Sequence, residues 1–203
     1  MKLSKLQKRV ITIKYKTKEN HIGSCLTAVP IIEEIYNRME TGDKFILSSG
    51  HAGVGLYAVL EERGLIPKNK IYKLESHPHR NEKYEIWAST GSLGHGIGIA
   101  VGMALTGIEV YCLLTDGECA EGSVWEALTI AEDNSLCNIH IYVNANGWGG
   151  LGSIDVDMLE KRLKTFNLDI QVIRTNSDFG EFKNLDSHYK SLTKEQYEKL
   201  IFK

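Results

Sequence analysis

The chain has 203 residues, of which 42% are hydrophobic and 25% charged, so it can bury the core of one domain. A formal net charge of −2 gives no overall attraction to nucleic acid or to a membrane surface. No continuous apolar stretch follows the basic amino terminus, which excludes a secretory signal, and no segment is long enough to span a membrane. We therefore expect a single domain over residues 1–203.

The four cysteines show no CxxC spacing, which argues against a zinc site. Cys112 and Cys137 lie in or beside apolar runs, so we expect buried free thiols rather than disulfides. Free thiols are typical of a reducing compartment, and we expect to find the protein in the cytoplasm.

Hydrophobic spacing predicts helices and strands that alternate along the chain. The helices are expected at residues 3–18, 24–39, 52–63, 123–134, 156–165 and from 193 onward, with Ser24 and Gly64 as caps. The strands are expected at residues 45–47, 110–114, 139–143 and 170–174. Pro30 conflicts with the second helix, which either begins late, near Val29, or kinks at the proline. This pattern indicates an α/β fold, an open and mostly parallel sheet flanked by helices, with ligands at the carboxyl ends of the strands.

A further helix is expected in a glycine-rich segment, where Gly94, Gly98 and Gly102 recur every fourth residue. Such a smooth stripe allows another backbone to approach closely, so we expect this helix to be buried at a tight contact. The segment does not fit the dinucleotide-binding fingerprint, because Ile99 stands where the last glycine belongs and no strand directly precedes it.

Two of the expected strands end in residues that can bind a metal. The strand at 110–114 leads to Asp116, and the strand at 139–143 leads to Asn146. The helix between them completes a βαβ unit, which brings the two strand ends side by side. Mg²⁺ prefers oxygen ligands and is often held by a carboxylate together with phosphate oxygens. Alone, Asp116 could be a helix cap and Asn146 a turn residue, but their pairing on neighbouring strands favours a site for a metal and a diphosphate.

The polar loops occur in an order that resembles the amino-terminal, diphosphate-binding domain of transketolases. The matching segments are residues 18–23, 48–52, 76–78, 89–96, 116–122 and 144–146, with a looser match at 187–190. A single Asp-Gly or His-Pro pair occurs by chance, but this ordered set covers nearly the whole chain. The resemblance implies the thiamine diphosphate-binding fold, shortened on its carboxy-terminal side.

The resemblance also implies a set of functional residues around thiamine diphosphate and Mg²⁺, or Ca²⁺ or Mn²⁺ in its place. The implied metal ligands are Asp116, Asn146 and the main-chain carbonyl of Trp148. The implied cofactor-binding residues are His51, Gly91, Ser92, Leu93, Asp116, Gly117, Glu118, Asn146 and His188. The implied catalytic residues are His21, His51, His77, Glu121 and His188. The histidines would bind sugar hydroxyls or move protons, and Glu121 would join a proton relay at a subunit contact.

The remaining histidines and Glu121 also have simpler interpretations. His79 is expected to be a solvated loop residue, and His140 a structural residue within a strand. His95 stands where the family usually has glutamine, so we expect it beside the site rather than in it. As a carboxylate at the start of a helix, Glu121 could simply be stabilised by the helix dipole.

The chain also departs from the family in ways that imply a partner. Thr115 stands where glycine is usual, and after Gly152 residues 174–180 bridge a gap in which the family has a further strand and helix. No segment matches the pyrimidine-binding domain, which provides the glutamate that hydrogen-bonds the aminopyrimidine. The resemblance therefore implies a split enzyme, in which a separately encoded chain carries the pyrimidine-binding and carboxy-terminal domains. Two copies of each would form a heterotetramer.

The implied activity is that of a transferase with sugar substrates, active only with its partner. It would move a two-carbon ketol unit from a ketose to an aldehyde or ketone acceptor. One alternative is another thiamine diphosphate-dependent activity, such as the decarboxylating ligation of an α-keto acid. The other alternative is a non-catalytic scaffold or regulatory subunit.

Overall fold

The computed structural model describes residues 3–150, 152–180 and 186–202. Within these residues, four parallel strands form one sheet in the order β1–β2–β3–β6. The strands are β1 (Lys44–Leu47), β2 (Val110–Thr115), β3 (Ile139–Ala145) and β6 (Asp169–Arg174). The expected α/β fold with a parallel sheet is therefore confirmed. Because Thr115 of β2 lies opposite Asn144 of β3, the residues that follow these strands emerge at the same edge.

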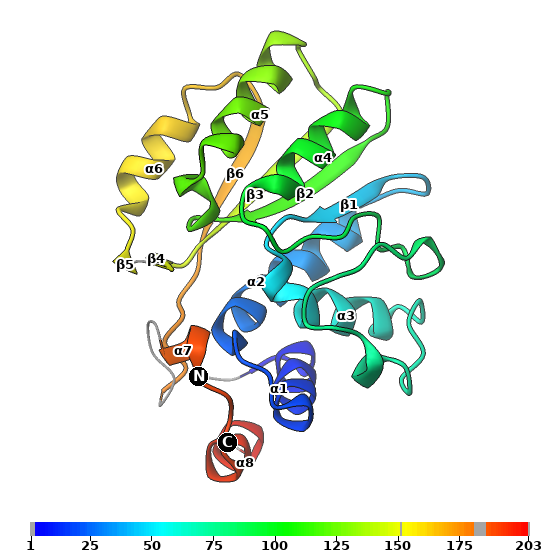
Figure 1. Ribbon diagram of the computed structural model, residues 1–203, viewed down its shortest axis with the longest axis vertical. Coiled ribbons are helices and arrows are strands. Elements are labelled where there is room, and N and C mark those ends of the chain that lie inside the picture. Colours follow the sequence, from blue (N-terminus) through cyan, green and yellow to red (C-terminus); the bar gives the residue numbers. More distant parts are fainter. Residues whose placement is uncertain (1–2, 151, 181–185, 203) are drawn as a thin grey trace.

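Helices cover both faces of the sheet (Figure 1). One face carries α1 (Lys5–Thr17), α2 (Ile22–Arg38) and α3 (Gly53–Glu62), and the other carries α4 (His95–Ala104), α5 (Gly122–Asp133) and α6 (Val156–Leu163). The smaller elements are the β-pair β4 (Trp148–Gly149) and β5 (Gly152–Ser153), and the helices α7 (Asp186–Tyr189) and α8 (Lys194–Phe202). None of the helices in the described ranges combines the length and apolar character needed to cross a membrane.

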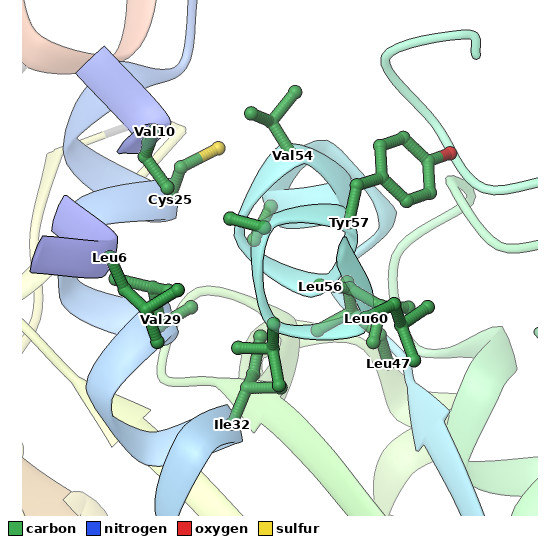
Figure 2. Close-up of a cluster of buried hydrophobic side chains, with 14 of the residues drawn as sticks. Leu6, Val10, Cys25, Val29, Ile32, Leu47, Val54, Leu56, Tyr57 and Leu60 are labelled. Atoms are coloured by element: carbon green, nitrogen blue, oxygen red, sulfur yellow. The ribbon is translucent and has the colours of Figure 1, made fainter. Parts of the chain in front are cut away.

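Alternate residues of each strand supply the two cores, because successive side chains of a strand point to opposite faces. Leu113 of β2 packs with α1, α2 and α3, whereas its neighbours Cys112 and Leu114 pack with α4, α5 and α6. Figure 2 shows part of the first core, with labelled side chains Leu6, Val10, Cys25, Val29, Ile32, Leu47, Val54, Leu56, Tyr57 and Leu60. The near-continuous apolar runs of the strands therefore reflect burial on both faces of the sheet.

Helix α2 begins earlier than its sequence suggests. Its N-cap is His21, in the left-handed conformation (φ 59°) and without a side-chain cap bond, so the prediction of a start at Ser24 or near Val29 was wrong. The helix continues through Pro30, which has no N–H to donate to the carbonyl of Leu26. The side-chain amide of Gln7 in α1 donates to that carbonyl instead, at 3.0 Å. A contact from a neighbouring helix therefore replaces the bond that the proline removes.

The glycine stripe of α4 is only partly a close contact. A Cβ on Gly96 would lie 2.4 Å from Ser48 Cα, so the start of the helix approaches the backbone that follows β1. Gly98 and Gly102 are exposed, and a Cβ on either would meet nothing within 4 Å. The prediction that the whole stripe is buried at a tight contact was therefore wrong within this chain.

The cysteines are free thiols, as expected. Cys112 is buried, as are Cys25 and Cys119, but Cys137 is exposed because it lies in the turn between α5 and β3. The expectation that Cys137 is buried was wrong.

Candidate active site

A cavity of about 260 Å³ opens at the edge of the sheet where the strands end. Its walls come from the segments that follow β1, β2 and β3, from the start of α2, from the loop before α4, and from α7. Open α/β sheets generally bind ligands at this edge. The sequence-predicted residues that line the cavity are His21, His51, His77, Gly91, Leu93, Gly117, Asn146, Trp148 and His188.

The other predicted residues lie around the cavity rather than on its surface. Asp116 and Glu118 are buried behind the wall, whereas Ser92 and Glu121 are exposed. Glu121 is the N-cap residue of α5, and its side chain makes no capping hydrogen bond. Its carboxylate is thus accessible to a second chain.

Histidines form one side of the cavity. The rings of His21 and His51 are 5.4 Å apart, and those of His21 and His188 are 6.4 Å apart, measured between centroids. Burial, with a smaller contribution from nearby positive charge, lowers the pKa of His21 to about 4 and that of His51 to about 3. Burial also lowers the pKa of His188. All three imidazoles are therefore neutral at pH 7, and each offers one donor and one acceptor nitrogen.

Two of these histidines have buried nitrogens without a partner in the described part of the protein, namely Nδ1 of His21 and Nε2 of His188. A buried polar atom without a partner costs free energy, so such atoms point to a missing ligand or water. The other nitrogen of His188, Nδ1, shares a hydrogen bond of 3.0 Å with Ser24 Oγ, which fixes the orientation of the ring.

Short contacts hold α7, and with it His188, against the start of α2. The backbone N–H of His21 donates to the carbonyl of His188 at 2.7 Å. A Cβ on Gly23 would lie 2.4 Å from Ser187 Oγ, so only glycine allows this approach. Farther along the chain, the ring of Tyr197 in α8 stacks on Tyr15 of α1 at 4.2 Å. The carboxy-terminal segment is therefore attached at both of its helices.

The segments that follow β2 and β3 carry oxygen ligands, and we call them the oxygen side of the cavity. Asp116 is 1% exposed, and its carboxylate accepts hydrogen bonds from the N–H groups of Gly147 at 2.6 Å and of Gly117 at 3.0 Å. Burial raises the pKa of Asp116 to about 6. The side-chain oxygen of Asn146 accepts from the N–H of Trp148 at 2.9 Å. The side chains of Asp116 and Asn146 are therefore both held by backbone N–H groups of the same turn, residues 146–148.

These oxygens are of the kind that Mg²⁺ prefers as ligands. No group of three or more His, Cys, Asp or Glu side chains there could hold an ion, so a metal would need amide and carbonyl oxygens as well. Asp116, Asn146 and the carbonyl of Trp148 form such a set, and a Cβ on Gly117 would lie 3.8 Å from that carbonyl. No cationic side chain pairs with Asp116 within the residues that the structure describes, which leaves its charge available to a metal.

Some cavity residues were missed by sequence reasoning, namely Ser24, Thr115, Gly149, Gly150 and Tyr189. The hydroxyl of Tyr189 donates to the carbonyl of Gly150 at 3.3 Å, and its ring lies 6.1 Å from that of His21. Tyr189 therefore connects α7 to the turn between β4 and β5. The sequence feature that could have identified Tyr189 as a cavity residue is its position directly after His188.

Comparison with known proteins agrees with this geometry. Residues 7–194 match the family described as transketolase, thiamine diphosphate binding domain. The chain belongs to the transketolase family. Among curated relatives, transketolase from Pongo abelii is 34% identical over 188 aligned positions, which cover 77% of this chain and 30% of that protein. A protein from Phocaeicola vulgatus, named as one of the subunits of apulose-4-phosphate transketolase, is 29% identical over 215 aligned positions, which cover 93% of this chain and 75% of that protein.

Solved transketolase structures share the fold. A transketolase mutant from Pichia stipitis, in complex with fructose-6-phosphate, matches with a TM-score of 0.74 and 20% identity. The match covers 97% of this chain and 40% of that chain, and at this identity it shows the fold alone. The chain thus spans less than a third of the animal transketolases it matches, but three quarters of the Phocaeicola vulgatus relative.

Proposed function

We propose that the chain is the amino-terminal subunit of a two-chain transketolase that binds thiamine diphosphate through Mg²⁺. The observation that carries the proposal is one cavity lined both by neutral histidines and by Asn146 and Trp148, which follow the buried carboxylate of Asp116 at the same edge of the sheet. The activity would be the transfer of a two-carbon ketol unit from a ketose to an aldehyde or ketone acceptor. The cofactor, when bound, supplies the carbanion chemistry, and the protein supplies binding, orientation and electrostatics.

In this proposal the oxygen side of the cavity anchors the cofactor. Asp116, Asn146 and the carbonyl of Trp148 hold the metal, whose charge the buried carboxylate offsets. Gly117 leaves room for the diphosphate. Gly91, with its neighbours Ser92 and Leu93, holds the aminopyrimidine end. A Cβ on Gly91 would lie 3.0 Å from the ring of His77, so glycine also keeps that histidine in place.

The histidine side binds the substrate and moves protons. We assign His51 and His188 to the cofactor, and His21 and His77 to the hydroxyl groups of the sugar. Because His21 and His51 are neutral at pH 7, each can donate to one oxygen and accept from another without a charge to desolvate. The unpartnered nitrogens of His21 and His188 are available for this role.

A second chain would complete the site. Large apolar side chains are exposed beside the cavity, on α4 or at its C-cap, and on α5, namely Leu93, Ile99, Leu105 and Ile130, each 38 to 49% exposed. Exposed apolar side chains gathered on neighbouring elements mark interaction surfaces. Glu121 lies at the start of α5, where a carboxylate from the partner could join it in a proton relay. The Phocaeicola vulgatus relative, whose name makes it one subunit of several, supports a separate partner with the pyrimidine-binding domain, and we propose an α2β2 assembly.

The location in the cytoplasm stays a prediction, which the free cysteines support.

Cofactor binding can be tested by thermal unfolding of the chain together with its partner. We expect thiamine diphosphate and Mg²⁺ together to raise the melting temperature, since a ligand that binds only the folded state stabilises it. Asp116→Ala should abolish this rise, whereas the control Asp133→Ala, at an exposed position of α5, should keep it. A wild-type complex that shows no rise, or an Asp116→Ala complex that shows a full one, would contradict the proposal.

A further inference from the structure

The carboxyl group of Glu118 is fully buried and accepts hydrogen bonds from three separate segments. Its Oε1 accepts from Ser48 Oγ at 2.6 Å and from the N–H of Gly94 at 3.1 Å. Its Oε2 accepts from the N–H of Thr115 at 3.1 Å. Glu118 is 0% exposed and does not line the cavity, although its sequence position suggested direct contact with the cofactor.

Each of the three segments continues into a wall of the cavity. Ser48 precedes the turn that carries His51, Gly94 ends the loop that carries Gly91 and Leu93, and Thr115 precedes Gly117. The loop that carries Gly91 and Leu93 and the segment that carries Gly117 are therefore both bonded to the side chain of Glu118.

The packing between the first two segments leaves no space for other side chains. A Cβ on Gly96 would lie 2.4 Å from Ser48 Cα, and a Cβ on Gly50 would lie 2.3 Å from the carbonyl of Thr90. Backbones this close have no interdigitating side chains to fix their register. The polar link through Glu118 supplies a directional contact in their place.

We propose that Glu118 is a positioning residue, which sets the relative placement of the three segments that bind thiamine diphosphate and its metal. The proposal rests on the proposed function for the identity of the ligand. The placement of the segments themselves is a property of the ligand-free chain.

The chemistry of the contacts explains why a carboxylate is needed. Both oxygens of Glu118 face backbone N–H groups, that of Gly94 on one side and that of Thr115 on the other. The amide of glutamine has one oxygen and one NH₂ group, so either orientation sets its NH₂ against an N–H. Glu118→Gln therefore loses at least one of these contacts while it keeps the size of the side chain.

The test measures cofactor binding and loop protection on the same set of variants of the full chain, with its partner present. The variants are Glu118→Gln, Ser48→Ala, and the control Glu33→Gln at an exposed position of α2. We expect Glu118→Gln to raise the dissociation constant of thiamine diphosphate at saturating Mg²⁺ about tenfold or more, as for a lost buried hydrogen bond to a charged group. Ser48→Ala should have a smaller effect in the same direction, and Glu33→Gln none.

Amide hydrogen exchange without any ligand provides the second measurement. In the Glu118→Gln chain, exchange should become faster in all three segments, at residues 48–52, 91–96 and 115–118. If Glu118→Gln destabilises the fold too far, Ser48→Ala should still show faster exchange at 48–52 and 91–96.

The two measurements separate the proposals. If the wild-type complex does not bind thiamine diphosphate, the proposed function fails, and the exchange pattern alone decides the role of Glu118. Faster exchange confined to 115–118, or a dissociation constant within about twofold of wild type in a folded Glu118→Gln chain, would overturn the positioning role.

Discussion

Two alanine substitutions in one helix test the close contact on which the cavity depends. Gly96 and Gly98 both lie in α4, but a Cβ on Gly96 would lie 2.4 Å from Ser48 Cα and 2.7 Å from Ser48 Oγ. A Cβ on Gly98 would meet nothing within 4 Å. Backbone atoms cannot move aside as a flexible side chain would, so Gly96→Ala must push the helix and the Ser48 segment apart.

The magnitudes follow from this geometry. Gly98→Ala should stabilise the chain by up to about 1 kcal/mol, because alanine favours the helix and the new methyl group enters open space. Gly96→Ala gains less of this propensity at the first turn and suffers overpacking of about 1–3 kcal/mol, so we expect a net loss of stability. For a chain of this length, each kcal/mol shifts the melting temperature by about 2–4 °C.

The assay is chemical and thermal unfolding of the isolated chain, so that no partner covers the exposed face of α4. Gly98→Ala should melt above wild type and Gly96→Ala below it. Gly96→Ala should also weaken binding of thiamine diphosphate, because Ser48 carries one of the links to Glu118. If Gly96→Ala is as stable as Gly98→Ala, the close approach of α4 to the Ser48 segment is wrong.

Three further results are expected. Burial lowers the pKa of His140, but its hydrogen bonds to Asp169 at 2.6 Å and Glu109 at 2.5 Å outweigh this and raise it above 6.5. The stabilisation from His140 should thus be complete below pH 6.5 and be lost as the pH rises through the raised value. Urea unfolding of wild type and His140→Gln across this pH range tests the prediction. A difference in the free energy of unfolding that does not change with pH would contradict it. His77→Ala should raise KM for the ketose donor or lower kcat with unchanged cofactor affinity; loss of cofactor binding would instead place His77 at the cofactor. Glu121→Gln should leave the melting temperature of the isolated chain unchanged and weaken assembly or activation in size-exclusion and activity assays, whereas full activity would remove it from the relay.

Much of the fold could be predicted because burial on both sides of a sheet leaves a strong pattern in the sequence. The strands β2 and β3 carry near-continuous apolar runs, since helices cover both faces, and the amino-acid sequence was therefore enough to place Asp116 and Asn146 at one edge. The prediction that the Asp116 carboxylate and the Asn146 amide lie close together depends only on the predicted βαβ unit.

Two of the failures, unlike that at Cys137, share a cause, because each depended on a contact from a distant part of the chain. Helix α2 passes Pro30 with the help of Gln7, which lies in another helix. In the glycine stripe of α4, Gly96 is in close contact with the Ser48 segment, whereas Gly98 faces open space. Which glycine makes the contact depends only on the path of the Ser48 segment. The burial of Glu118, on which no prediction was made, likewise depends on Ser48 and Gly94, although Asp-Gly-Glu by itself is typical of a polar turn. Local propensity carries no information on such contacts.

The stacking of Tyr197 on Tyr15 has a practical consequence for anyone who handles this protein. It couples α8 to α1. The short helix α7, which carries His188, precedes α8 in the chain and is itself bonded to the start of α2 (Figure 1). A change that disturbs α8 would thus also act on the imidazole of His188 in the cavity. An affinity tag is therefore better placed where it leaves α8 undisturbed. If a preparation shows low activity, the first thing to check is that α8 is intact.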